Sequence, residues 1–161
     1  MLDLVIRGAT VVDGTGELPF NADVGIRDGR IAEVGHIGSA ARETLDAQGA
    51  WLTPGFVDIH THYDGQATWD ETFSPSIHHG VTTLLMGNCG VGFAPLRPGS
   101  EDRLIKLMEG VEDIPGVALR EGVRFSWESF SQYMDALDAM PHSLDFLTMV
   151  PHDPLRMLVM G

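Results

Sequence analysis

Two histidines separated by one residue, His60 and His62, are the residues of this sequence best suited to chemistry. They end the run 54–62, in which a Pro-Gly turn leads into the apolar stretch 56–59. Side chains of an extended strand alternate with period two, so both imidazoles share one face. Imidazole binds divalent ions and suits zinc. A bare His-x-His also fits two solvated histidines, but the end of a buried strand favours half of a metal site.

The single cysteine, Cys89, is the next candidate, and its being alone excludes an internal disulfide. It follows a second apolar run, 80–86, in the segment Asn-Cys-Gly-Val-Gly-Phe at 88–93. Carboxyl ends of neighbouring parallel strands meet at one edge, so we expect Cys89 near His60 and His62. A lone cysteine is often a small buried hydrophobe, but a thiolate is also a strong zinc ligand. We therefore interpret Cys89 as a third ligand.

Four further residues lie where the predicted strands end. Asp58 and Asp64 flank the histidines and could accept the second N–H of an imidazole, although we expect Asp58 to lie too deep. His152 follows a third predicted strand, and Phe93 offers an apolar wall. We take Asp64, Phe93 and His152 as candidates for a substrate pocket.

The elements that must position these residues change type near residue 54. Before it, short alternating strands and an Asp-Gly hairpin turn at 28–29, joining 22–27 to 30–35, predict a small antiparallel β-domain over 1–53. After it, apolar strands at 56–59, 80–86 and 144–150 alternate with helices, which predicts an α/β fold with a parallel sheet.

Two helices are predicted between the second and third strands. Ser100 is a candidate N-cap for one, whose apolar face runs from Leu104 to Val111. Ser126 is a candidate N-cap for the other, which Pro141 ends. Their apolar stripes are assigned to the core.

Several of these segments resemble a known family. The run 54–62 resembles the first-strand signature of the amidohydrolase superfamily, and Gly-Val-Thr-Thr at 80–83 resembles its second-strand entry. The runs 86–95 and 108–115 resemble the N-acyl-D-amino-acid deacylase (D-aminoacylase) branch. The resemblance covers nearly the whole chain. It implies the small β-domain over 1–53 and the first part of a metal-dependent (β/α) barrel over 54–161.

The resemblance also implies an activity. It makes the chain part of a zinc-dependent hydrolase acting on carbon-nitrogen bonds other than peptide bonds, with N-acyl-D-amino acids as its small-molecule substrates. His60, His62 and Cys89 would be ligands of one or two Zn²⁺ ions. The general-base aspartate and two more histidines are expected beyond Gly161. Because the chain stops amid the apolar residues 155–161, we expect a truncated chain without complete catalytic machinery.

Two alternatives stay open. A cyclic-amide hydrolase of the hydantoinase or dihydroorotase type would need a carboxylated lysine at a strand end, but the sole lysine, Lys106, lies in a predicted helix. A non-catalytic remnant or assembly subunit would expose an open barrel edge, which favours self-association.

Composition limits the partners. The net charge of −13 argues against nucleic acid, because binding phosphates requires clustered Lys and Arg. No apolar run has the length of a membrane span, and the first residues lack a signal-peptide pattern. We expect a cytoplasmic protein.

Overall fold

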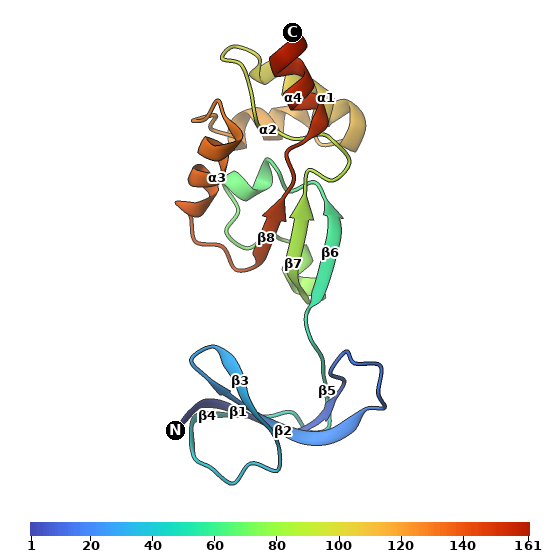
Figure 1. Ribbon diagram of the computed structural model, residues 1–161, viewed down its shortest axis with the longest axis vertical. Helices are drawn as coiled ribbons and strands as arrows, with labels where there is room; N and C mark the ends of the chain where they lie inside the picture. Colours follow the sequence, from blue (N-terminus) through green and yellow to red (C-terminus); the bar gives the residue numbers. More distant parts are fainter. The chain divides into compact units, whose positions relative to one another are not determined.

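The computed structural model describes all residues, 1–161, and the chain divides into two compact units, Met1–Pro54 and Gly55–Gly161 (Figure 1). The first unit is a five-stranded sheet of order β3-β2-β1-β4, with β5 also paired to β1. Its strands are β1 (Leu2–Val11), β2 (Phe20–Arg27), β3 (Arg30–Gly35), β4 (Ala41–Asp46) and β5 (Trp51–Leu52).

The predicted hairpin between β2 and β3 is confirmed. These strands pair antiparallel, and Asp28 and Gly29 at the turn have φ angles of 51° and 69°. Positive φ at both central residues is what a type I′ turn requires.

The expectation that this unit is antiparallel throughout is wrong, because β4 and β5 pair with β1 in parallel. The connection after β3 explains the difference. Its Ile37 is buried against Leu2 and Val5, and the Ile37 carbonyl accepts a hydrogen bond from Arg7 at 2.8 Å. The connection therefore crosses over the sheet, and β4 returns beside β1 in the same direction.

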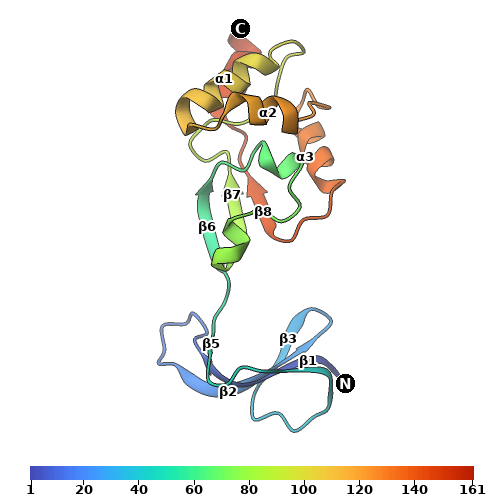
Figure 2. The same cartoon turned by 180° about the vertical axis from the view of Figure 1, so that it is seen from behind.

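The second unit contains a three-stranded parallel sheet, as predicted, with the order β6-β7-β8. In both ribbon views the three strand arrows point the same way, toward α1, α2 and α4 (Figures 1 and 2). Its elements are β6 (Phe56–Thr61), η1 (Gln66–Thr68), η2 (Ser76–His79), β7 (Val81–Met86), α1 (Glu101–Glu112), α2 (Gly116–Gly122), α3 (Phe130–Asp138), β8 (Asp145–Thr148) and α4 (His152–Met160). No helix combines the length and the apolar character needed to cross a membrane.

The helix predicted after Ser100 is confirmed as α1, which buries Leu104, Ile105 and Met108. Val111 does not join this face, because its side chain stays 53% exposed. The helices α2 and α4 were not predicted, and α4 includes most of the apolar segment 155–161.

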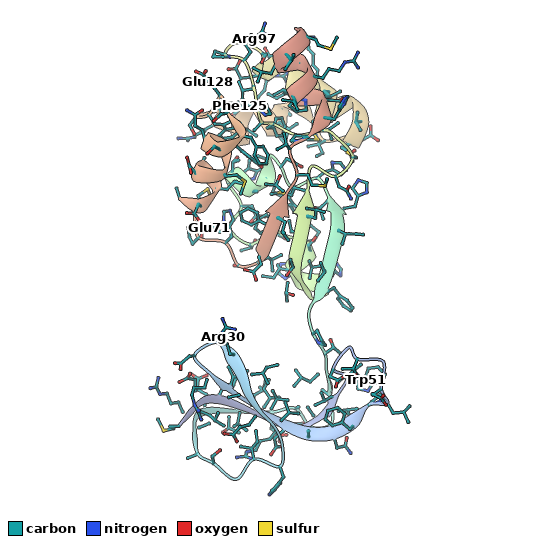
Figure 3. All side chains as sticks on the ribbon, in the orientation of Figure 1. Arg30, Trp51, Glu71, Arg97, Phe125 and Glu128 are labelled. Atoms are coloured by element: carbon teal, nitrogen blue, oxygen red, sulfur yellow. The ribbon has the colours of Figure 1, made fainter.

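The prediction that Ser126 caps the next helix is wrong, because α3 begins after Ser129. The Ser129 hydroxyl accepts the backbone N–H of Gln132 at 3.2 Å, and the Gln132 side chain accepts the N–H of Ser129 at 2.9 Å. Glu128, labelled in Figure 3, also donates its backbone N–H to Gln132. This reciprocal capping box needs Glu or Gln three residues after the cap, which Ser126 lacks.

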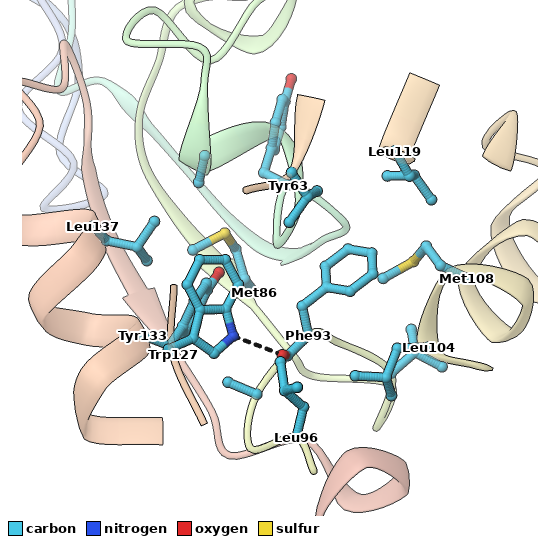
Figure 4. Packing of buried hydrophobic residues seen from close by; sticks show 14 of the residues in the cluster. Tyr63, Met86, Phe93, Leu96, Leu104, Met108, Leu119, Trp127, Tyr133 and Leu137 are labelled. Carbon is cyan, nitrogen blue, oxygen red and sulfur yellow. Dashed lines mark hydrogen bonds between the residues drawn. The ribbon is translucent and has the colours of Figure 1, made fainter. Parts of the chain in front are cut away.

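The core of the second unit lies among the helices and the strand ends (Figure 4). Trp127, which precedes α3, is 4% exposed and donates its indole N–H to the Phe93 carbonyl at 2.9 Å. Tyr133 is 1% exposed and donates its hydroxyl to the Asp64 carbonyl at 2.8 Å. Each of these bonds anchors a loop that leaves a carboxyl end of the sheet, and those loops carry the candidate site residues.

Candidate metal centre

The structure brings the two histidines and the cysteine together. His60 lies in β6, His62 immediately after it, and Cys89 three residues beyond β7. Ligand-capable atoms of these three residues all lie within 4.8 Å of one another. The Cys89 Sγ is 3.7 Å from Nε2 of His62 and 3.9 Å from Nδ1. Two imidazoles and one thiol therefore converge at the carboxyl edge of the parallel sheet.

Hydrogen bonds between neighbouring segments fix this arrangement. Thr61, between the two histidines, points into the protein and donates its hydroxyl to the Leu85 carbonyl at 2.8 Å. Asn88, next to Cys89, donates its side-chain amide to the Ile59 carbonyl at 2.8 Å. Each strand end is thus bonded to the other, and the bonds join the residues on either side of the candidate ligands.

The turn that leads to Cys89 requires glycine at position 87. Gly87 has a φ of 75°, and a Cβ atom there would lie 2.5 Å from the backbone oxygen of Met149. A side chain would therefore incur both left-handed strain and a clash with main chain. Glycine lets the loop turn tightly over the end of β8 and present Cys89.

The electrostatics around His62 favour a neutral ring. Burial lowers the pKa of His62 below its usual range, the Glu112 carboxylate works against this shift, and His60 adds to it. A neutral imidazole is the form that binds a metal ion. The Glu112 Oε1 lies 3.2 Å from His62 Nε2.

The two flanking aspartates have different surroundings. Asp58 accepts the backbone N–H of His60 at 3.1 Å, so it braces the strand end. Asp64 is 1% exposed, and burial raises its pKa to about 7. Its Oδ2 has no hydrogen-bond partner. A buried carboxylate with an oxygen that accepts no hydrogen bond is stabilised by a proton or by a nearby cation. Asp64 lies two residues after His62 in the sequence.

The other two pocket candidates lie in contrasting places. Phe93 is in the core rather than at a pocket wall: it is 1% exposed, and its ring packs edge-on against Phe125, 5.7 Å away between centroids. Phe93 belongs to the same buried cluster as Leu104, Met108 and Leu119, and burial in such a cluster stabilises an aromatic ring. His152 is exposed at the start of α4, and its Cβ faces Gly90, the residue after Cys89.

Glu112 is the site residue that the sequence reasoning missed. It belongs to one of the segments that carry the family resemblance but received no role. One signal was available: it is an acid in the last turn of α1, and that turn contains no basic residue. The negative end of the helix dipole disfavours a carboxylate there, so such a residue needs another reason to be present.

The three converging side chains fit a zinc ion. A tetrahedral zinc with bonds of about 2.0 to 2.3 Å holds its ligand atoms roughly 3.3 to 3.8 Å apart. The ligand-capable atoms of the three residues lie within 4.8 Å of one another, which is close to that spacing. Nitrogen and sulfur donors are the ones that zinc prefers.

Comparison with known proteins agrees with this chemistry. The family model described as "Amidohydrolase family" matches residues 43–158 of this chain. The model of the N-terminal domain of the urease alpha-subunit matches residues 1–48. The chain is 36% identical over 159 residues to a D-aminoacylase of Alcaligenes xylosoxydans xylosoxydans. This alignment covers 98% of this chain and 31% of the relative.

Solved structures give the same result. A D-aminoacylase studied for its binuclear metal centre superposes with a TM-score of 0.81 at 38% identity, over 100% of this chain and 32% of that one. An N-acyl-D-glutamate deacylase of Bordetella bronchiseptica, complexed with zinc and a phosphonate inhibitor, gives 0.72 at 33% identity, over 99% and 31%. The chain thus spans about a third of the length of these relatives. It belongs to the amidohydrolase family.

Proposed function

We propose that this chain is part of a zinc-dependent amidohydrolase that cleaves the amide bond of N-acyl-D-amino acids, with His60, His62 and Cys89 as metal ligands. The convergence of Cys89 with the histidine pair is the observation that carries the proposal. The similarity to D-aminoacylase and to N-acyl-D-glutamate deacylase, which extends over nearly all of this chain, supports the substrate class.

The residues of this chain would perform the preparatory part of the chemistry. Amide hydrolysis needs a strong nucleophile and a polarised carbonyl, and a bound zinc supplies both by acidifying its water to a pKa of about 7 and by acting as a Lewis acid. The partly buried His62 is kept neutral and so available as a ligand. The bonds from Thr61 and Asn88 hold the two strand ends at a fixed separation, which keeps the donors preorganised.

The fold supports a further part of the proposal. A complete (β/α) barrel has eight parallel strands and needs about 250 residues. Residues 55–161 contain three parallel strands with helices between them. We propose that this unit is the opening part of such a barrel, and that residues 1–54 are the small β-domain attached to it.

Comparing two enantiomers tests this function. The full-length protein of which we propose this chain to be part is purified, loaded with Zn²⁺ and assayed with N-acetyl-D- and N-acetyl-L-amino acids, with and without prior chelation. We expect release of the free D-amino acid, a clear preference over the L-enantiomer, and loss of turnover on chelation that added Zn²⁺ reverses. Preference for the L-enantiomer, or turnover that survives chelation, would overturn the proposal. Turnover of hydantoins or dihydropyrimidines instead would favour the cyclic-amide alternative.

A further inference from the structure

The end of α1 reaches the candidate metal centre. Glu112 is the last residue of that helix, and its Oε1 lies 3.2 Å from Nε2 of His62. The same nitrogen faces the Cys89 Sγ at 3.7 Å. The Glu112 side chain is 23% exposed and that of His62 is 18% exposed. A carboxylate oxygen and a thiol sulfur thus approach one imidazole nitrogen in a partly desolvated corner.

The position of Glu112 is determined by its surroundings rather than by a free side chain. The helix α1 is anchored by Leu104, Ile105 and Met108, which are each at most 2% exposed. One turn before its end, the Glu109 carboxylate accepts the backbone N–H of Gly116 at 3.1 Å, which ties α1 to the start of α2. The chain therefore holds the end of α1, and with it the Glu112 carboxylate, beside His62.

This carboxylate has little else to stabilise it. It lies at the negative end of the helix dipole, the last turn of α1 has no basic residue, and the only basic side chain within ion-pair distance is the imidazole of His62. A partly buried carboxylate in such a place gains most from a cation. Together with one thiolate, one carboxylate would balance the two charges of a zinc ion.

We propose that Glu112 is a fourth protein ligand of the metal centre, supplied by a helix in the connection between β7 and β8 rather than by a strand end. The inference rests on the metal centre proposed above. Zinc accepts carboxylate oxygen at about 2.0 to 2.2 Å together with imidazole and thiolate donors, and it can expand to five ligands, which would leave a position for the water that the proposed hydrolysis needs. The Glu112 carboxylate and the His62 imidazole nitrogen lie close enough that both would reach one bound cation.

Two isosteric substitutions test whether Glu112 binds the metal ion directly or only contributes a negative charge nearby. Glu112→Gln keeps the size of the side chain and an oxygen that can still contact His62, but a neutral amide is a much poorer zinc ligand. Asp113→Asn removes the same charge one residue later, and Asn tolerates the φ of 55° found there. Circular dichroism verifies that both variants fold.

The measurements are the Zn²⁺ dissociation constant, from competition with a chromophoric chelator, and the visible absorption of the Co²⁺-loaded protein. We expect Glu112→Gln to weaken Zn²⁺ binding by about tenfold or more and to change the cobalt spectrum, with Asp113→Asn within about twofold of the parent. Equal weakening in both variants, or an unchanged constant and spectrum in Glu112→Gln, would overturn the inference. If the unmodified protein binds no zinc, the metal centre itself fails, which is a distinguishable result.

Discussion

Removing the hydroxyl of Tyr133 tests whether the core holds the loop that carries the candidate site. In Tyr133→Phe the Asp64 carbonyl loses a donor at 2.8 Å, and no water can replace it easily because both residues are 1% exposed. A buried acceptor left unsatisfied costs about 1 to 3 kcal/mol. Burial also holds the pKa of Tyr133 well above its usual value, so the hydroxyl stays a donor throughout the neutral range.

The assay is urea unfolding at pH 7, followed by fluorescence. Trp127 is 4% exposed and its ring centroid lies 5.0 Å from that of Tyr133, so its emission reports on this core. Trp51 belongs to the first unit and is replaced by Phe in all samples, whereas Trp69 lies in the same unit as Trp127, so the remaining emission reports on the second unit. We expect the folding equilibrium constant to fall about 5- to 150-fold, which is what 1 to 3 kcal/mol corresponds to, with an unchanged dependence on urea.

Tyr63→Phe is the matched control. The Tyr63 hydroxyl lies 2.8 Å from the Ser76 Oγ and also accepts the Ser76 backbone N–H at 3.2 Å. Ser76 is only partly buried, so water can replace the hydroxyl for both groups. We expect a cost of about 0.5 to 1 kcal/mol for this variant. The reasoning is refuted if Tyr133→Phe costs no more than Tyr63→Phe.

Two further perturbations give smaller, equally specific results. Ser129→Ala removes the capping box of α3 and should lower the free energy of unfolding by about 1 kcal/mol. The control Ser100→Ala removes no side-chain cap bond from α1 and should leave the free energy of unfolding nearly unchanged. Equal costs of the two substitutions in thermal unfolding would contradict this prediction. Burial alone would raise the pKa of Asp70, but hydrogen bonds from Thr72, Gln66 and Ser74 outweigh this effect and lower the pKa to about 2. A lowered folded pKa stabilises the protein above about pH 4 and loses that contribution toward pH 2. The lowering of the Asp70 pKa from 3.8 to about 2 corresponds to about 2.4 kcal/mol, and solvent screening reduces this contribution to about 1 to 2 kcal/mol. The free energy of unfolding, measured with urea, should therefore fall less between pH 5 and pH 2 in Asp70→Asn than in the parent protein. An identical fall in the two proteins would count against this prediction.

The features that the sequence predicted correctly depend on short-range signals. The hairpin at Asp28 follows from two residues that tolerate positive φ, and the parallel sheet follows from apolar strands alternating with helices. The proximity of Cys89 to the histidines follows from the same rule, since neighbouring parallel strands end at one edge.

The features that were missed depend on contacts between distant residues or on competition between similar local signals. The parallel return of β4 depends on Ile37 packing on β1, which no local pattern contains. The start of α3 depends on Gln132, three residues after Ser129, which decides between two serines that both satisfy the simpler capping rule. An aromatic residue in a long loop can face a pocket or the core, and only the tertiary fold buries Phe93. Glu112 meets His62 across fifty residues of sequence.

X-ray absorption spectroscopy of the zinc-loaded protein tests the central claim most directly. We predict one sulfur scatterer per zinc at about 2.3 Å, together with nitrogen or oxygen scatterers near 2.0 to 2.1 Å. The sulfur scatterer should disappear in Cys89→Ala, and the zinc content after dialysis should fall with it. Zinc bound by nitrogen and oxygen alone in the unmodified protein, or unchanged zinc content in Cys89→Ala, would contradict a metal centre built from Cys89 and the two histidines.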